Sequence, residues 1–307
     1  MVKETVTTDV VESAPVETTE VVEEVNNEDT LDQLMNKLDI TTLDVVTTNL
    51  KTMVVNEQGG VLGYLGKGVT VRNLGAEGDK YKIQYYDQVG YVTNTFVTAA
   101  TILDINSVAN KMLCATNDIE LTVPDYLSNT GSEYTVTIPK NELLEVFEEN
   151  DSMYIVRTTN LLGYINKENV QEIEGTFLVV DISDQEVKLY ENNQVILDTN
   201  CVTGKESTPT HEGLWHVYSI THNRYLVGEG YKSWVDYMFS FNDGEGLHDA
   251  EYHSCNAMAN HGWRAPEDFG GEKYMRSGSH GCVNMKHDAV AFLDDYVYMD
   301  MPVLVKK

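Results

Sequence analysis

The sequence predicts a mainly β protein built from several small domains, and three observations support this fold class. From about residue 41 onward, the chain consists of short alternating strands separated by Gly and Asn turns. Helical spacing of apolar residues is confined to two short stretches, 27–39 and 287–297. The chain has 307 residues, 42% of them hydrophobic, which is enough for two or three domains with real cores.

Residues 1–26 are predicted to form an acidic disordered tail. They consist mainly of Thr, Val and Glu, with seven acidic residues and one Lys. Such a composition cannot bury enough apolar surface to offset the entropy of ordering, so we expect a solvated spacer.

A short helix is expected next, over residues 27–40. Asp29 or Thr30 can cap it, and its apolar residues recur at helical spacing: Leu31, Leu34, Met35 and Leu38. A helix this short is marginal in isolation, so it needs a packing partner.

Two blocks, 41–100 and 101–173, repeat one pattern of strands. Each has a Lys-bearing turn, an acidic turn and a Tyr-containing strand, and each closes on the triplet Gly-Tyr-apolar. The closing triplets start at Gly90 and Gly163, which are 73 positions apart (163 − 90). Blocks of about 60 residues with five short strands fit small antiparallel barrels.

The first block resembles a bacterial SH3-like domain. The similarity rests on Val61-Leu62-Gly63-Tyr64-Leu65, on Gly68, and on Asp79-Lys80-Tyr81-Lys82-Ile83, in which Tyr81 replaces the usual Trp. The second block resembles the same family less closely. The resemblance implies two SH3-like barrels that either bind glycan or other cell-wall material, or serve as spacers for a catalytic domain. The fold alone does not decide between these roles.

Charge and composition exclude several classes of function. The formal net charge is −28 at pH 7 and the sequence pI is about 4.4, which disfavours binding to nucleic acid or to an anionic membrane surface. No apolar run approaches the ~18 residues of a membrane span. No leader pattern precedes residue 30, so the protein is either cytosolic or written without its leader. The four cysteines show no CxxC spacing and do not indicate a disulfide framework.

The segment 248–284 is rich in His and Cys, and its pattern favours thiol chemistry. Gly281 precedes Cys282, and a Gly lets the backbone approach a substrate carbonyl closely. His280 and Cys282 share a face if the segment is extended. A second His from another strand can then act as the base that such a Cys needs.

A zinc site is the main alternative on chemical grounds. His and Cys are zinc ligands, and the candidates are His248, His253, Cys255, His261, His280 and Cys282. Their spacing fits neither the usual zinc-ligand pairs nor an HExxH motif. A purely structural role for these residues is the third interpretation, and the residues alone leave all three open.

Residues 174–307 resemble an L,D-transpeptidase catalytic domain of the YkuD type. The resemblance rests on Ser279-His280-Gly281-Cys282-Val283-Asn284, on Val202-Thr203-Gly204-Lys205, on Thr208-Pro209-Thr210 with Gly213, and on the closing strand Pro302-Val303-Leu304-Val305. His211 replaces the usual Pro of this pattern. The resemblance implies a β-sandwich with one or two helices, with Cys282 as nucleophile and neither a metal nor a cofactor.

The family's general base matches one of two histidines. His248, in Phe241–Ala250, has the closer sequence context but precedes His280 by 32 positions (280 − 248), so it requires an insertion. His261 precedes it by 19 positions (280 − 261), which is the usual family spacing. We favour His248, because loops tolerate insertions. Residues 251–262 then form an inserted loop.

The resemblance also implies roles for other residues. His280 would orient or polarise the site, and Gly281 would contribute its backbone to an oxyanion site. The remaining candidates would support the loop or line the cleft: Ser279, Asn284, Trp263, Arg264, Tyr231 and Trp234.

The implied activity is acyl transfer on peptidoglycan stem peptides in the extracellular cell wall. The enzyme would release the terminal D-Ala of a tetrapeptide stem, form 3→3 cross-links and be a carbapenem target. An L,D-carboxypeptidase acting on the same stem is the alternative within the enzyme class. A non-catalytic wall-binding protein is the alternative outside it.

Overall fold

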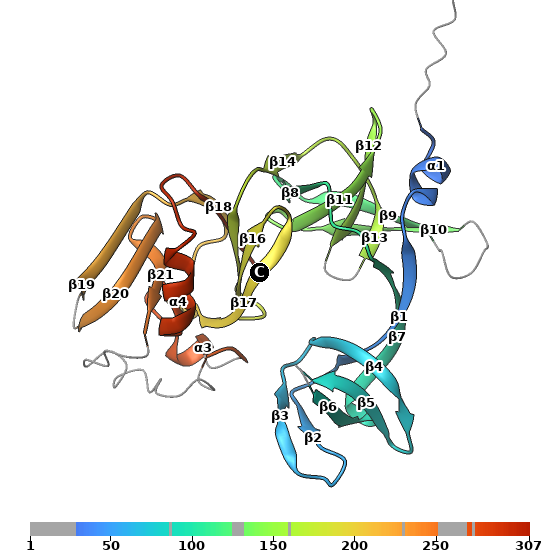
Figure 1. Cartoon of the computed structure of the whole chain (residues 1–307), viewed down its shortest axis with the longest axis horizontal. Coiled ribbons are helices and arrows are strands. Elements are labelled where there is room, and N and C mark those ends of the chain that lie inside the picture. Colours follow the sequence, from blue (N-terminus) through green and yellow to red (C-terminus); the bar gives the residue numbers. More distant parts are fainter. Residues whose placement is uncertain are drawn as a thin grey trace, which may run out of the picture.

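The computed structural model is mainly β and contains three sheets (Figure 1). It describes residues 29–85, 88–124, 132–158, 161–228, 231–250, 269–271 and 274–307. The expected tail, residues 1–26, lies outside the described residues. Within the described residues, no helix is long and apolar enough to cross a membrane.

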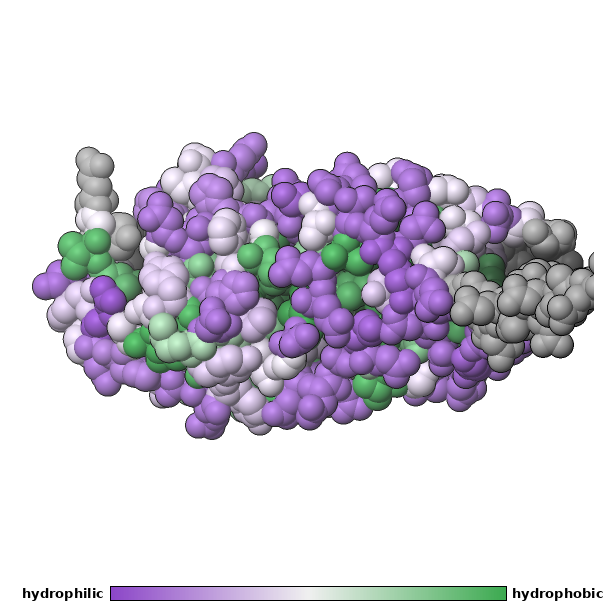
Figure 2. All heavy atoms as spheres, turned by 90° about the horizontal axis from the view of Figure 1, so that it is seen from above, coloured by the Kyte–Doolittle hydropathy of each residue, from purple (hydrophilic) through white to green (hydrophobic). Residues whose placement is uncertain are grey.

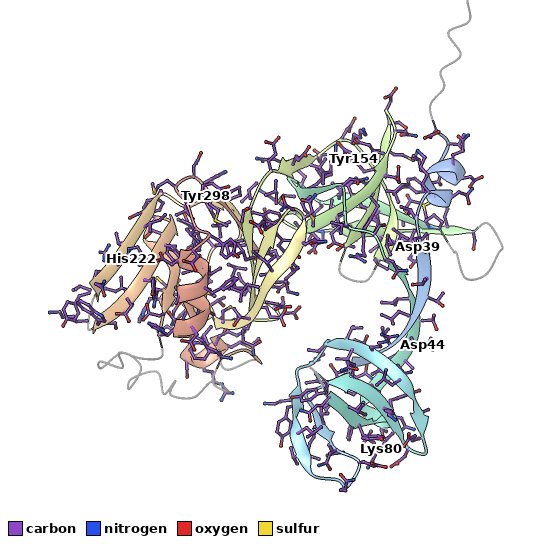
Figure 3. All side chains as sticks on the ribbon, viewed as in Figure 1. Asp39, Asp44, Lys80, Tyr154, His222 and Tyr298 are labelled. Carbon is purple, nitrogen blue, oxygen red and sulfur yellow. The ribbon has the colours of Figure 1, made fainter. Side chains whose placement is uncertain are left out.

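The first sheet has the strand order β3-β2-β6-β5-β4-β1-β7. Its strands are β1 Ile40–Thr48, β2 Thr52–Val55, β3 Val61–Leu65, β4 Thr70–Glu77, β5 Lys80–Tyr85, β6 Gln88–Thr93 and β7 Val97–Ile105, with a 3₁₀ turn η1 at Asn94–Phe96. The β1–β7 ladder extends from this sheet towards the second one, and Asp44 lies on it (Figures 1 and 3).

The second sheet repeats the topology of the first, with the order β10-β9-β13-β12-β11-β8-β14. Its strands are β8 Lys111–Ala115, β9 Ile119–Pro124, β10 Glu133–Ile138, β11 Leu143–Glu149, β12 Met153–Thr158, β13 Leu161–Asn166 and β14 Val170–Ile173. Gly90 and Gly163 lie on the equivalent strands β6 and β13. A Cβ on either would approach a neighbouring strand to 2.4 or 2.3 Å, so both positions require Gly.

Helix α1 (Leu31–Asn36) packs on the second sheet, although the first sheet follows it in sequence. Thr30 is its N-cap and forms a capping box with Gln33. Leu34 is fully buried in a cluster with Phe147 and other residues of the second sheet. This contact supplies the partner that so short a helix needs.

The C-terminal domain is a curled nine-stranded sheet with the order β18-β23-β15-β16-β17-β22-β21-β20-β19. Its elements are β15 Phe177–Asp181, β16 Glu186–Glu191, β17 Gln194–Val202, β18 Gly213–His216, β19 Ser219–Gly228, β20 Tyr231–Asn242, β21 Glu245–Asp249, α3 Tyr274–Ser277, β22 Val283–Met285, α4 His287–Asp294 and β23 Pro302–Lys306. Strand β17 pairs with both β16 and β22, and the two halves share one core. Asn192 and Asn193 form the expected tight turn, both with positive φ.

Strand β15 joins the C-terminal domain to the second sheet, because it is buried on both faces. Leu178 and Val180 point into the core of the C-terminal domain, whereas Phe177 and Val179 join the cluster that contains Phe147. An unbroken apolar run, Phe-Leu-Val-Val, is what a strand covered on both faces requires.

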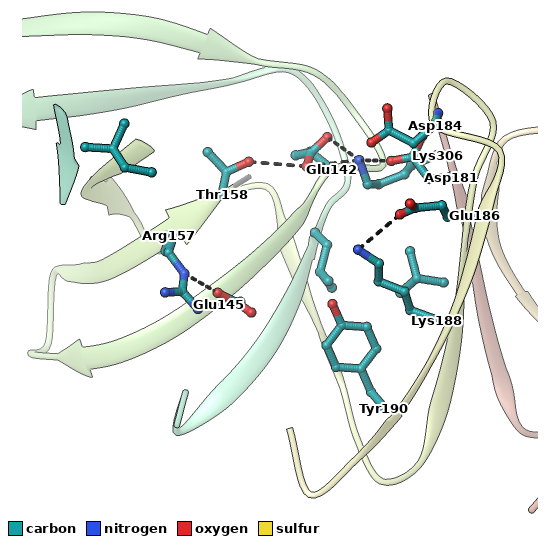
Figure 4. Close-up of a pocket in the computed structure, with 13 residues that line it drawn as sticks. Glu142, Glu145, Arg157, Thr158, Asp181, Asp184, Glu186, Lys188, Tyr190 and Lys306 are labelled. Carbon is teal, nitrogen blue, oxygen red and sulfur yellow. Dashed lines mark hydrogen bonds and ion pairs between the residues drawn. The ribbon is translucent and has the colours of Figure 1, made fainter. Parts of the chain in front are cut away.

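A cavity of about 280 Å³ lies at the same junction (Figure 4). Lys306 bridges the two domains there, with Nζ 2.7 Å from Asp181 and 3.4 Å from Glu142. Burial raises the pKa of Glu142, and Lys306 opposes this effect. Apolar burial on both faces and a mostly buried ion-pair cluster therefore hold the two domains together.

One face of the protein is largely hydrophilic. Figure 2 shows hydrophilic residues over most of one face, with hydrophobic residues in small groups between them.

Phe177→Ala should lower the free energy of unfolding by about 3–5 kcal/mol, because it removes a fully buried ring at the domain junction. Phe177 also stacks on Tyr190, with ring centroids 4.8 Å apart. Urea denaturation followed by fluorescence measures the change. The control, Val195→Ala, removes a side chain that is 45% exposed and should cost under about 0.5 kcal/mol. A loss of under about 1 kcal/mol for Phe177→Ala would contradict the structure of this junction.

Candidate active site

Parallel pairing of β21 and β22 brings His248 next to the cysteine of the motif. In this register Leu247 is opposite Val283 and His248 is opposite Asn284. Extending it by one residue places Cys282 opposite Gly246. Residues two apart on a strand share a face, so Cys282 and Asn284 lie on the same side of the sheet as His248.

His248 is a buried histidine whose ring is neutral at pH 7. Its Nδ1 lies 2.9 Å from the backbone oxygen of Asp249. Because a carbonyl oxygen only accepts, Nδ1 carries the proton and Nε2 keeps its lone pair. Burial lowers the pKa of His248 from its usual value of 6.5, and the bond to Asp249 opposes that shift only in part. At neutral pH the imidazole is therefore ready to take a proton at Nε2.

Cys282 is a thiol whose surroundings disfavour ionisation. Burial raises its pKa to about 11, and Glu245 adds to this increase, whereas a hydrogen bond from the Gly246 amide opposes it. The Sγ atom also lies 3.7 Å from the Gly244 oxygen. At neutral pH the sulfur is protonated, and a thiol reacts as a nucleophile only once its proton leaves.

The loop before β22 is held in a tight turn. The buried Ser279 accepts a hydrogen bond from the Gly281 amide at 3.0 Å and donates one to the Cys282 carbonyl oxygen. Gly281 has a φ of 117°, and a Cβ there would lie 2.8 Å from Glu245 Oε1. This position therefore requires Gly, and its amide is already bonded to Ser279.

A second turn, residues 203–210, donates hydrogen bonds to the backbone carbonyls of this loop. Thr208 Oγ1 donates to the Ser279 carbonyl and Thr210 Oγ1 to the Gly281 carbonyl, each at 2.8 Å. The Lys205 amide also donates to Ser279 O, at 3.1 Å. The sequence pattern marked this turn, but nothing in it indicated that threonine hydroxyls fix the cysteine loop.

Glu245 and His211 form a pair at the rim of the site that sequence reasoning missed. His211 Nδ1 lies 2.7 Å from Glu245 Oε1. The Glu245 side chain is 10% exposed and that of His211 is 66% exposed. The pair joins positions 34 residues apart, so the only signal in the sequence was the His in place of Pro.

The other predicted site residues differ in burial, and several of them lie outside the described part of the chain. His280 is exposed, and Asn284 is buried, with an Oδ1 that has no hydrogen-bond partner among the described residues. Trp234 packs edge-on against Tyr225 on the β19–β20 hairpin. The side chains of Tyr231, His261, Trp263 and Arg264 lie outside the described residues, as do His253 and Cys255.

The other described cysteines differ from Cys282 in accessibility. Cys114 and Cys201 are buried and free, whereas Cys282 is partly exposed. In the parts of the chain that the structure describes, no group of three or more His, Cys, Asp or Glu could hold a metal ion.

A family model described as "YkuD: L,D-transpeptidase catalytic domain" matches residues 175–305. This segment belongs to that family. The matched L,D-transpeptidase domain includes strands β21 and β22 of the site and the motif loop between residues 279 and 282. No curated protein matches the chain.

Several solved structures are similar to the chain. The catalytic domain of the Enterococcus faecium L,D-transpeptidase is 30% identical, with a TM-score of 0.37; the match covers 44% of this chain and 98% of that one. A cysteine-to-serine mutant of an E. faecium L,D-transpeptidase is 25% identical, with a TM-score of 0.39 and coverage of 62% and 75%. A Mycobacterium smegmatis L,D-transpeptidase is 14% identical, with a TM-score of 0.35 and coverage of 67% and 90%.

The rate at which iodoacetamide alkylates Cys282 should depend on pH, and this dependence should report the protonation state of His248. The rate should stay constant across neutral pH, fall once His248 becomes protonated below pH 6.5, and rise towards the Cys282 pKa of about 11. In His248→Gln the plateau should vanish, leaving a rise of about tenfold per pH unit. Peptide mapping by mass spectrometry measures labelling at Cys282 itself.

The matched control for this experiment is His216→Gln, which changes an exposed His on β18 and should leave the profile intact. A plateau that survives in His248→Gln would show that His248 is not the base.

Proposed function

We propose that this protein is a peptidoglycan L,D-transpeptidase that uses Cys282 as its nucleophile. The observation that supports the proposal is the parallel pairing of β21 with β22, in which His248 is opposite Asn284, two residues after Cys282. Family membership of residues 175–305 supplies the reaction class. Stem peptides of peptidoglycan are the proposed substrates.

The first half-reaction is acylation. His248 Nε2 takes the Cys282 proton as the sulfur attacks the carbonyl that joins the third stem residue to the terminal D-Ala. The carbon–nitrogen bond breaks, and D-Ala leaves with the proton that His248 returns. A thioester on Cys282 remains.

Stabilisation of the oxyanion is assigned to the backbone amide of Cys282. The Gly281 amide was the other candidate, but it donates to Ser279 Oγ in the resting site. Gly281 therefore contributes through its backbone conformation. We assign to the exposed His280 a role in polarising the substrate above the loop.

The second half-reaction decides between two activities. If the amine of a second stem attacks the thioester, a 3→3 cross-link forms. If water attacks, the enzyme is an L,D-carboxypeptidase. Acylation is the same in both.

The substrate implies an extracellular site of action in the cell wall. The two N-terminal sheets are proposed to be SH3-like barrels that bind wall glycan. In support, the equivalent strands β3 and β10 each carry an exposed tyrosine, Tyr64 at 56% and Tyr134 at 51%. Such rings can stack on the apolar faces of sugars.

Incubation of the full chain with a disaccharide-tetrapeptide should release D-Ala, and Cys282→Ser should abolish the release, because the alkoxide required is far harder to form. Mass spectrometry of the products measures the outcome. A cross-linked dimer identifies transpeptidation, and a disaccharide-tripeptide alone identifies carboxypeptidase activity. Undiminished turnover by Cys282→Ala would contradict the proposed chemistry.

A carbapenem should acylate Cys282, because its strained carbonyl mimics the acyl donor. The E. faecium catalytic domain described above has also been solved acylated by ertapenem. Intact-protein mass spectrometry should show one adduct, and His248→Gln should slow its formation about 10²-fold or more. An adduct on another residue, or none, would count against Cys282 as the nucleophile.

A further inference from the structure

The pair of Glu245 and His211 is built into the rim of the active site. Glu245 accepts three hydrogen bonds: from His211 Nδ1 at 2.7 Å, from the His211 amide at 3.3 Å and from Asn242 Nδ2 at 3.1 Å. A buried carboxylate with three donors has a fixed orientation. The pair therefore holds the His211 ring in one place.

That place is at the strand end whose backbone contacts the reacting sulfur. The residues on either side of Glu245, Gly244 and Gly246, both contact Cys282 Sγ through their backbones. Glu245 Oε1 also lies against Gly281. From the other side, Thr210, which precedes His211, donates to the Gly281 carbonyl. His211 is thus anchored to both segments that flank Cys282.

Glu245 also determines which nitrogen of His211 is basic. A carboxylate accepts, so Nδ1 carries the proton and Nε2 keeps a lone pair. Nε2 has no hydrogen-bond partner among the described residues. The side chain is 66% exposed, so it exchanges protons readily with water. His248, in contrast, is buried.

The acceptor amine has more protons to lose than His248 alone can account for. An alkyl amine of the lysine kind has a pKa near 10.4, so at neutral pH it arrives as an ammonium ion. Two protons must leave its nitrogen before the new amide is complete. The departing Cys282 sulfur takes one of them through His248. The other has to reach solvent.

We infer that His211, oriented by Glu245, is the acid–base residue that removes this second proton from the acceptor. His211 Nε2 accepts a proton from the ammonium group, and the freed nitrogen lone pair attacks the thioester carbonyl. The carbon–sulfur bond breaks, and its electron pair stays on sulfur, which is protonated by way of His248. His211 then releases its proton to water. The inference rests on the proposed function, because it requires a thioester on Cys282.

The test separates the two half-reactions in the full chain. Wild type and His211→Gln are acylated with tetrapeptide, and mass spectrometry follows formation of the thioester and its consumption by added lysine amide. Thioester formation should stay within about twofold of wild type. Consumption should slow at least about tenfold, as expected for loss of an acid–base group. With hydroxylamine, an amine that is already neutral at pH 7, the two proteins should react alike.

A second variant guards against a folding defect. Glu245→Gln keeps the volume of the side chain but removes the carboxylate that orients His211. Because Glu245 also raises the pKa of Cys282, acylation changes too, so the readout is the ratio of the two amines on the preformed thioester: consumption by lysine amide should slow relative to consumption by hydroxylamine. The matched control is His222→Gln. His222 is another exposed histidine paired with a carboxylate, Asp294, at 2.7 Å, and it lies on the β19–β20 hairpin (Figure 3). This control should change neither half-reaction.

Two results would overturn the inference while leaving the proposed function intact. One is consumption of the thioester at the wild-type rate in His211→Gln. The other is an equal slowing of both half-reactions with both amines, which would mean that the pair only braces the loop. If wild type forms no thioester on Cys282, the proposed function fails and the inference fails with it.

Discussion

The parallel pairing of β21 with β22 is the constraint on which the site depends. It fixes the register of His248 against Asn284 and brings the Gly246 amide to the Cys282 sulfur. Parallel neighbours cannot be joined by a tight turn, so these strands need a long connection. That connection spans residues 250–282. His248 is thus set by the sheet, and Cys282 by the motif loop that leads directly into β22.

The environment of the pair determines its chemistry. Burial lowers the pKa of His248 and raises that of Cys282, so both groups are neutral at rest. A neutral pair avoids a permanent charge on either of these two groups. The carboxylate of Glu245 opposes early ionisation of the sulfur. The same carboxylate orients His211, so Glu245 acts both on the Cys282 thiol and on the His211 ring.

Local signals in the sequence predicted local structure well. The Asn192-Asn193 turn, helix α4 and the repeated strand pattern are visible because neighbouring residues encode them. Contacts between distant residues were not predictable. Thr210 meets Gly281 across 71 positions, and α1 packs on the second sheet rather than on the first. The pairing of His248 with Asn284 across β21 and β22 was not predictable from spacing either. Such contacts depend on how strands are ordered, which composition and periodicity do not specify.

Nitrogen-15 NMR of the histidine rings, with His248→Gln for assignment, tests the central claim most directly. The account predicts that His248 at pH 7 is neutral, with the proton on Nδ1 and a bare Nε2, and that it gains its second proton only below pH 6.5. An imidazolium at pH 7, or a neutral ring with its proton on Nε2, would contradict it.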